Sequence, residues 1–179
     1  MWSPDGTKIA FDGTGGLYTM TASGSSQTNI DTSGSYPSWS PDGTKIVFQK
    51  LDGLSITQIF VANADGSSQT ALTSSSDPNF NPVWSPDGNK IVWNGPLQTI
   101  QKMNPDGTSK TTVFTAANGA GVQYPTWSPD SSTILFSYYI PGTESTYGLY
   151  SVSASGGTAT QLYYDSSSGV NTSMWGSLE

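Results

Sequence analysis

A five-residue motif, Trp-Ser-Pro-Asp-Gly, recurs along this chain and constrains its fold more than any other feature. Complete copies begin at Trp2, Trp39 and Trp84, and a variant that ends in Ser131 begins at Trp127. Successive copies start 37, 45 and 43 residues apart, and a single Trp175 follows the last copy by 48 residues. A period near 40 residues is the length of one four-stranded propeller blade. The recurrence therefore predicts a single all-β propeller unit over residues 1–175, with four blades in the chain.

Each copy of the motif leads into the same succession of strand-like segments. An aromatic residue follows the motif Trp by nine residues in every copy: Phe11, Phe48, Trp93 and Phe136. Two further strand-like runs follow at constant spacing. In an antiparallel four-stranded meander, the constant turns would share one face of the propeller and the connections of variable length would share the other. Binding function usually resides in variable loops on a constant scaffold, so the variable face is the expected binding face.

The composition agrees with an all-β fold and limits the classes of partner. The chain contains 34% hydrophobic and 11% charged residues, and its net charge is −7. An acidic chain lacks the basic face that nucleic acids require. No apolar run approaches the ~20 residues of a membrane-spanning helix, and no signal peptide is recognisable, so membrane insertion is not expected. The polar, weakly charged composition favours a periplasmic or extracellular protein.

Catalytic chemistry has few candidates in this sequence. The chain contains no His and no Cys, which excludes a Ser-His-Asp triad, a thiol nucleophile and an ordinary zinc site. Acidic residues could act in pairs, but those outside the fixed turns show no diagnostic spacing: Asp12, Asp52, Asp77, Glu144 and Asp165. We therefore expect a protein that is not an enzyme and that needs no cofactor or metal.

Aromatic residues on the variable face are the candidate binding residues. Tyr138, Tyr139 and Tyr147 are the first candidates, because the loop predicted between Tyr138 and Tyr147 is the longest in the chain. Tyr36, Phe80 and Tyr124 are the others. Exposed aromatic rings around a pore suit a sugar or peptide ligand. The alternative is that these rings pack against neighbouring blades.

The repeat resembles that of TolB-type, WD-repeat-like β-propellers. The resemblance rests on Trp-Ser-Pro-Asp-Gly-x-Lys-Ile-Ala/Val-Phe and on the segment from Ile59 to Thr73, and it covers Met1 to Trp175. It implies radially arranged blades with the motif Trp packed between them, which gives a structural role to five residues: Trp2, Trp39, Trp84, Trp127 and Trp175. Family members serve as binding platforms, as TolB does in the bacterial envelope, or as gating domains attached to serine peptidases.

This resemblance and the absence of catalytic groups favour a non-enzymatic scaffold for assembly or protein binding. Neither the α/β domain of TolB nor a peptidase domain is recognisable in the chain. Two alternatives remain open at this point. The chain could be the gating propeller of a larger peptidase-like enzyme, or it could be a lectin-like module that binds a glycan.

The first repeat lacks its lead-in strand, because only Met1 precedes Trp2. Four blades could close alone, or two chains could close an eight-bladed ring. We expect the homodimeric ring, in which Asn171 to Trp175 of each chain completes the first repeat of the other. Gly176 to Glu179 resembles a cloning scar, and both ends fall within a repeat, as in an excised or engineered fragment. Ser131 replaces a turn glycine, which predicts a looser or reshaped turn there.

Overall fold

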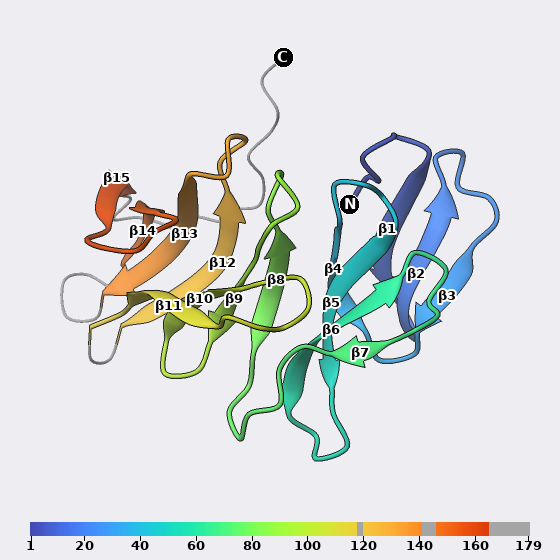
Figure 1. Cartoon of the computed structure of the whole chain (residues 1–179), viewed down its shortest axis with the longest axis horizontal. Coiled ribbons are helices and arrows are strands. Elements are labelled where there is room, and N and C mark those ends of the chain that lie inside the picture. Colours follow the sequence, from blue (N-terminus) through green and yellow to red (C-terminus); the bar gives the residue numbers. More distant parts are fainter. Residues whose placement is uncertain (118–119, 141–145, 165–179) are drawn as a thin grey trace.

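The computed structural model describes residues 1–117, 120–140 and 146–164, which form four antiparallel β-sheets (Figure 1). The first sheet contains β1 (Lys8–Gly13), β2 (Gly16–Thr21) and β3 (Thr28–Asp31). The second contains β4 (Ser35–Trp39), β5 (Lys45–Leu51), β6 (Thr57–Asn63) and β7 (Thr70–Ala71). The third contains β8 (Phe80–Trp84), β9 (Ile91–Gly95), β10 (Thr99–Met103) and β11 (Thr111–Thr115). The fourth contains β12 (Gly121–Trp127), β13 (Thr133–Ile140), β14 (Thr146–Ser153) and β15 (Thr160–Tyr164). Among these residues no helix has the length and hydropathy needed to cross a membrane.

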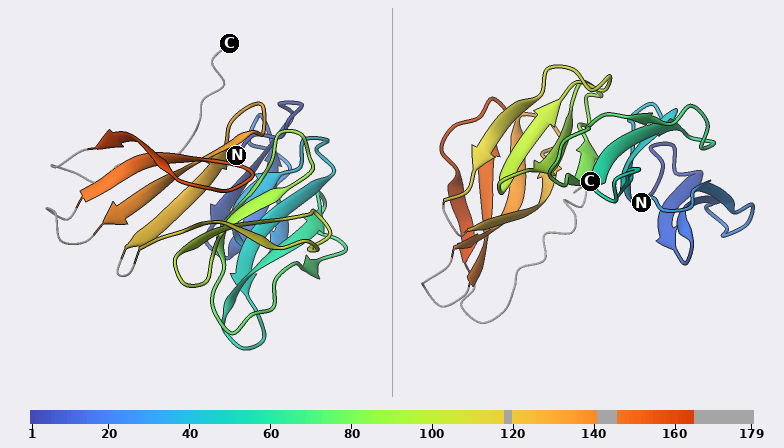
Figure 2. Two further views of the ribbon diagram at one scale, coloured as in Figure 1. Left: turned by 60° about the vertical axis from the view of Figure 1, so that its left-hand side comes forward. Right: turned by 90° about the horizontal axis from the view of Figure 1, so that it is seen from below.

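The sheets are consecutive antiparallel meanders, which confirms the predicted all-β fold of repeated blades. Each sheet contacts the next one along the chain, mainly through the neighbouring strands β4, β8 and β12. The first and fourth sheets lie at opposite sides of the molecule in Figures 1 and 2, and their described strands do not touch. The strand order places the Ser-Pro-Asp-Gly turns at one end of every sheet and the variable connections at the other.

The first sheet has three strands where the others have four. Met1 and Trp2 supply only the end of its innermost strand, since Trp2 bridges to Ile9 and the Met1 carbonyl accepts the Ala10 N–H at 2.8 Å. Within the described residues this sheet therefore has no complete lead-in strand. The segment expected to replace it, residues 171–175, lies outside the described residues, and so does Trp175.

Three hydrophobic cores lie between successive sheets, and each is built around one motif Trp. Trp39, Trp84 and Trp127 are 5%, 8% and 5% exposed and pack with apolar residues of the preceding sheet and of their own sheet. Alternation along a strand turns every second side chain to the same face, so each inner strand supplies a residue to a core between sheets. Trp2 differs from the expectation that all motif Trp residues are inter-blade: it is 56% exposed, because no described sheet lies on its outer side.

The motif forms the same hydrogen-bonded turn in each repeat. In the second repeat, the Ser40 hydroxyl donates to Asp42 Oδ1 at 2.6 Å and accepts the Lys45 N–H at 2.9 Å. The same carboxylate oxygen accepts the Thr44 N–H at 3.0 Å. Gly43 completes the turn at a φ of 69°, which a residue without Cβ adopts at little cost. The constancy of the motif is thus explained by local hydrogen bonding.

The prediction that Ser131 reshapes its turn is wrong. Ser131 adopts a φ of 60°, and the Ser128 and Asp130 side chains keep the same pattern of bonds. The Ser131 hydroxyl also accepts the N–H of Asp87, in the motif turn of the neighbouring sheet, at 3.1 Å. A left-handed conformation costs a residue with a Cβ about 1–2 kcal/mol. The turn's own hydrogen bonds and this added one offset that cost.

We expect the fold to lose stability in acid through these turns. Hydrogen bonds from the Ser128 hydroxyl, the Ser132 N–H and the Ser132 hydroxyl lower the pKa of Asp130 from 3.8 to about 2. A depressed folded-state pKa contributes stability that is complete above about pH 4 and is lost as the pH falls towards 2. Asp130→Asn should therefore lower the urea midpoint at neutral pH and flatten its decline between about pH 4 and pH 2. Leu54→Ala, at a residue that is 80% exposed and carries no ionisable group, should leave that decline unchanged.

Candidate functional site

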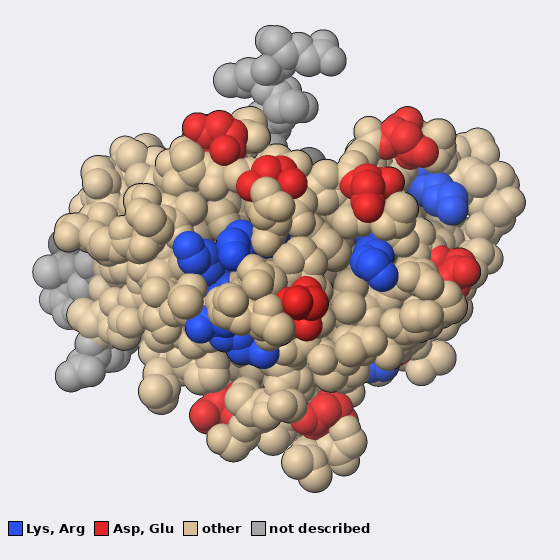
Figure 3. All heavy atoms as spheres, in the orientation of Figure 1, with Lys and Arg blue, Asp and Glu red and all other residues tan. Residues whose placement is uncertain are grey.

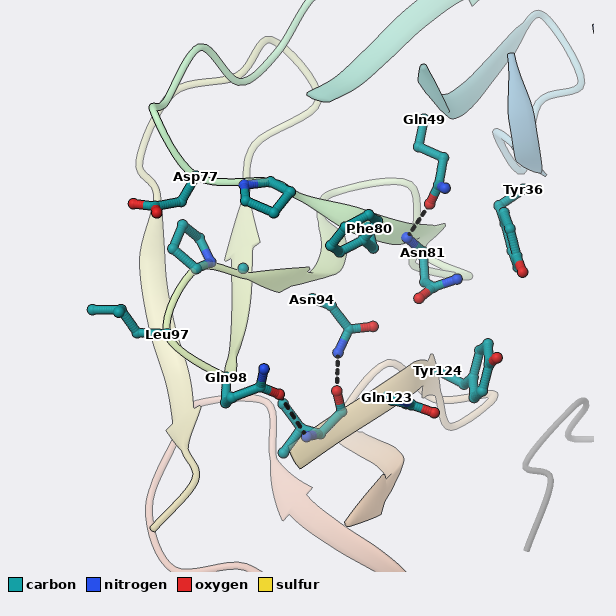
Figure 4. Close-up of a pocket in the computed structure, with 14 residues that line it drawn as sticks. Tyr36, Gln49, Asp77, Phe80, Asn81, Asn94, Leu97, Gln98, Gln123 and Tyr124 are labelled. Atoms are coloured by element: carbon teal, nitrogen blue, oxygen red, sulfur yellow. Dashed lines mark hydrogen bonds between the residues drawn. The ribbon is translucent and has the colours of Figure 1, made fainter. Parts of the chain in front are cut away.

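A pocket lies where the innermost strands of the second, third and fourth sheets begin, on the variable-loop face (Figure 4). Its volume is about 580 Å³, within the range of small-molecule sites. We call it the axial pocket. Fourteen residues line it: Tyr36, Gln49, Asp77, Pro78, Phe80, Asn81, Asn94, Gly95, Pro96, Leu97, Gln98, Val122, Gln123 and Tyr124.

A repeated β-bulge presents one residue of each inner strand to this pocket. Tyr36, Asn81 and Tyr124 each stand three residues before a motif Trp and directly before a proline. Their φ angles are 52°, 52° and 53°, and the strand register shifts at each of them. Proline has no N–H to contribute to the ladder, so it fits a position where pairing is interrupted. The bulges therefore place equivalent side chains of three sheets around one cavity.

The residue after the aromatic that recurs in each repeat supports the inner strand of the next sheet. Both carboxylate oxygens of Asp12 accept the Tyr36 N–H at 3.1 Å, and Gln49 Oε1 accepts the Asn81 N–H at 2.7 Å. Asn94 occupies the equivalent position but donates from Nδ2 to the Val122 carbonyl at 2.9 Å. Its Oδ1 is buried and has no hydrogen-bond partner. Polar side chains thus hold the inner strands in place across the sheet boundaries.

The long connection before β8 is held by a buried polar network. Asn79, which is 2% exposed, accepts the Trp93 indole N–H at 2.8 Å and donates to Gln58 Oε1 at 3.0 Å. Gln58 Oε1 also accepts the Thr73 hydroxyl at 2.7 Å, and Gln58 Nε2 donates to the Ser75 carbonyl at 2.7 Å. Because Asp77, Pro78 and Phe80 lie in or next to this connection, the network positions one wall of the axial pocket.

Three of the predicted binding residues meet in the axial pocket. Tyr36, Phe80 and Tyr124 line it and are 46%, 38% and 37% exposed. Figure 4 shows them on three successive inner strands around the cavity. The carboxamide residues that complete the lining, such as Gln49, were not expected from the sequence. The sequence marks such positions only by spacing. Each bulge residue directly precedes Pro-x-Trp, and the polar residue that bonds the next inner strand directly follows the strand aromatic.

The first-ranked binding candidates lie elsewhere. Tyr138 is 8% exposed, packs in the core between the third and fourth sheets, and accepts the Ala117 N–H at its hydroxyl. The expectation of an exposed ligand-binding Tyr138 is therefore wrong, because β13 extends to Ile140 and alternation turns Ile134, Phe136 and Tyr138 to the same buried face. Tyr139 and Tyr147 pair with each other in β13 and β14, and Tyr139 is not among the residues that line the axial pocket. The structure describes the Tyr147 backbone only.

The axial pocket is polar but nearly uncharged. Among the described residues that line it, Asp77 is the one carboxylate, and there is no lysine. A smaller hollow of about 350 Å³ lies at the opposite end, between the first two motif turns, and its Asp5 and Asp42 carboxylates are engaged by their own turns. In the described part of the chain no group of three His, Cys, Asp or Glu residues could hold a metal.

Basic side chains gather over the third sheet, as Figure 3 shows. Lys102 belongs to β10, and Lys90 and Lys110 directly precede β9 and β11. Lys90 donates to Asn104 Oδ1, Lys102 to the Ala154 carbonyl of the fourth sheet, and Lys110 to the Gly107 carbonyl of its own connection. These bonds give the three lysines structural partners within the third sheet and across its boundary with the fourth.

Comparisons with known proteins agree with this architecture. The family model of the TolB beta propeller domain matches residues 1–179. A putative TolB from Agrobacterium tumefaciens superposes with a TM-score of 0.79 at 21% identity, over 91% of this chain and 64% of that one. TolB from Acinetobacter baumannii gives 0.75 at 20% identity, over 91% of this chain and 42% of that one.

An enzyme shares the same architecture. Oligogalacturonate lyase from Vibrio parahaemolyticus gives a TM-score of 0.67 at 14% identity, over 92% of this chain and 52% of that one. A search of curated protein sequences finds no match. The likeness to solved structures concerns the fold, and the chain spans only part of the length of each of these proteins.

Proposed function

Because the chain belongs to the TolB beta propeller domain family, we propose that it is a non-enzymatic scaffold for protein assembly that completes its ring with a second copy of itself. The observation that supports this most is a difference between internal and terminal sheets. Positions that are buried at every internal boundary are exposed at both ends of the described arc. Each end therefore presents one half of the boundary that the chain builds three times internally.

The leading face of the first sheet exposes its motif Trp. Trp39, Trp84 and Trp127 are buried against a preceding sheet, whereas Trp2 is 56% exposed. The trailing face of the fourth sheet has the complementary property. Ile30, Leu72 and Val113 are 4%, 4% and 5% exposed beneath the next sheet, and Leu162, their equivalent, is 53% exposed. Burying such an aromatic and such an aliphatic side chain would stabilise an association of two copies.

The geometry of this contact is head to tail. The leading face of one copy would meet the trailing face of another, which is a heterologous contact. Such contacts form a closed ring when the rotation per chain divides the circle, and two chains of four blades would give eight blades. A pair of identical boundaries would then close the ring, with no exposed terminal face.

The first sheet also offers an unfilled strand position. A hollow of about 340 Å³ lies beside Ala10, Phe11 and Asp12. It continues from the point where Met1 and Trp2 end their pairing with β1. Residues 171–173 of a second copy would fit this position, whereas Met174 and Trp175 would compete with Met1 and Trp2 for the same place on β1.

The chemistry of the axial pocket supports a non-enzymatic role. Among the described residues that line it, Asp77 is the single carboxylate, whereas glycoside cleavage uses a pair of acids. The chain has no His or Cys to act as base or nucleophile. The carboxylates whose pKa is lowered are engaged in the motif turns, the related turns at Asp65 and Asp106, and the Lys50–Asp31 ion pair, away from this pocket.

The mass in solution tests the assembly. We expect light scattering to give twice the chain mass of 18.9 kDa. Trp2→Ala and Leu162→Glu should each shift the protein towards a single chain, because each removes one side of the same contact. Leu54→Glu, at a residue that is 80% exposed on the β5–β6 connection, is the matched control and should remain dimeric.

Two results would contradict the proposed assembly. One is a single-chain mass at every protein concentration. The other is a dimer that persists unchanged in both Trp2→Ala and Leu162→Glu. Deletion of residues 171–179 distinguishes strand exchange from contact between the sheet faces. Loss of the dimer supports strand exchange, and retention of the dimer restricts the contact to the sheet faces.

A further inference from the structure

We propose that the axial pocket binds a short, uncharged oligosaccharide. The inference rests on which groups line the cavity and on which of their hydrogen-bonding atoms are unused. It goes beyond the assembly function and does not rest on how the ring closes, because the lining residues that carry it belong to a single chain.

Three partly exposed aromatic rings provide apolar surface in the axial pocket. Tyr36, Phe80 and Tyr124 come from β4, β8 and β12, so the rings surround the cavity from neighbouring sheets (Figure 4). Two of the rings carry hydroxyl groups. An aromatic ring offers a flat apolar face, and a tyrosine adds a polar edge. A sugar ring has the matching character, with C–H groups on its faces and hydroxyl groups around its edge.

Carboxamide groups provide the polar part of the lining. The side chains of Asn81 and Gln123 make no hydrogen bond with another described residue, and Gln49 and Gln98 use only Oε1. Each carboxamide carries an acceptor oxygen and two donor hydrogens. A sugar hydroxyl likewise both donates and accepts. The unused groups of the pocket are therefore of the kind that hydroxyl groups can satisfy.

Asn94 adds a buried acceptor without a partner. Its side chain is 6% exposed, and Figure 4 shows Oδ1 directed towards the space between Asn81 and Tyr124. Buried polar atoms in folded proteins are nearly always hydrogen-bonded, so an unused one beside a cavity indicates a donor from outside the chain. A ligand hydroxyl, or a water held by the ligand, would supply that donor.

The lack of positive charge selects against acidic ligands. No lysine lines the axial pocket, and the chain has no arginine. Asp77, the single charged residue of the lining, is directed away from the centre of the cavity in Figure 4. Phosphates, uronates and peptide carboxylates are normally held by cationic side chains. An uncharged glycan is the hydroxyl-rich ligand that this lining fits.

Calorimetric titration of the full chain tests this proposal, after a glycan array has selected the best neutral oligomer of glucose, galactose or N-acetylglucosamine. We expect the neutral oligomer to bind and an oligogalacturonate to bind more weakly or not at all. Tyr124→Ala should weaken binding on the order of tenfold, as removal of a central aromatic contact does. Gln123→Ala should weaken it through lost hydrogen bonds.

Tyr163→Ala is the matched control, because Tyr163 is 53% exposed on β15 and lies outside the axial pocket. Its affinity should equal that of the unmodified chain, and thermal melting should establish that all three variants are folded. The proposal is overturned if no neutral oligomer binds or if oligogalacturonate binds more tightly. It is also overturned if binding survives both pocket substitutions unchanged.

Discussion

Trp84→Ala is expected to lower the free energy of unfolding by about 3–5 kcal/mol, the cost of truncating a large aromatic side chain in a packed core. Trp84 is 8% exposed and lies between the second and third sheets. It packs with Val47 and Ile59 from one sheet and Ile91 from the other. The cavity left by the indole would span the central boundary of the chain, and the neighbouring strands could close it only by moving the two sheets together.

Urea unfolding monitored by circular dichroism measures this effect. Leu54→Ala is a suitable control, because Leu54 is 80% exposed and should change stability by no more than about 0.5 kcal/mol. The Trp84 indole also donates to the Gly88 carbonyl at 3.1 Å, and Trp84→Phe would remove this bond while keeping much of the packing. We expect Trp84→Phe to be intermediate. A Trp84→Ala protein as stable as the Leu54→Ala control would contradict the role of the indole as an inter-sheet wedge.

Asn79→Leu is the second substitution with a large expected effect, on the order of 2–4 kcal/mol. It would leave the Trp93 indole N–H buried without an acceptor, and Gln58 Oε1 would lose the N–H that Asn79 donates to it. Trp93 and Gln58 are each 1% exposed, so water could not replace the lost partner without opening the core. The cost arises mainly from the orphaned Trp93 N–H, because Gln58 Oε1 keeps its bond from the Thr73 hydroxyl and leucine is close to asparagine in size.

A double-mutant cycle separates this mechanism from simple misfit. Trp93→Phe removes the indole N–H, so the combination with Asn79→Leu should cost less than the sum of the two single changes. Asn63→Leu serves as the control, because its amide bonds the exposed Ser67 hydroxyl at the end of β6. Full additivity in the cycle would show that the Asn79–Trp93 bond contributes nothing to stability.

The same substitution should also affect the axial pocket. Asn79 Nδ2 donates to the Ser75 hydroxyl and to the Asp77 carbonyl, and it thereby shapes the connection that leads to Phe80. This link between the buried network and the pocket wall could not be inferred from the repeat. The residues 72–79 belong to a connection of variable length, and their contacts depend on the packing of two sheets.

Local pattern was informative wherever interactions are short in range. The Ser-x-Asp spacing implies a side chain that caps its own turn, and the hydrogen bonds within each motif turn reflect this. The same reasoning failed at Ser131, because the hydrogen bond that helps to hold its left-handed conformation comes from Asp87 in the preceding repeat. A contact between residues 44 positions apart leaves no mark in the local sequence.

The candidate binding residues also divide into those that the sequence places correctly and those that it does not. Tyr36, Phe80 and Tyr124 are marked in the sequence by aromatic character and by position before a motif Trp. Tyr138 has the same character but is buried, because β13 runs further than expected and its alternation continues into the core. Whether an aromatic residue faces a ligand or a neighbouring sheet depends on strand length and register, which are fixed by pairing between strands.

By itself the sequence determined the number of sheets, their order, the constant turns and the absence of histidine and cysteine chemistry, because these follow from spacing, residue type and bonds within a few residues. The tertiary structure alone decided which side chains surround the axial pocket, that Asn94 keeps an unused acceptor, and that Trp2 and Leu162 are exposed at the two ends. Those properties arise when successive sheets pack against one another. Packing across a boundary depends on both partners at once, whereas a repeat describes only one of them.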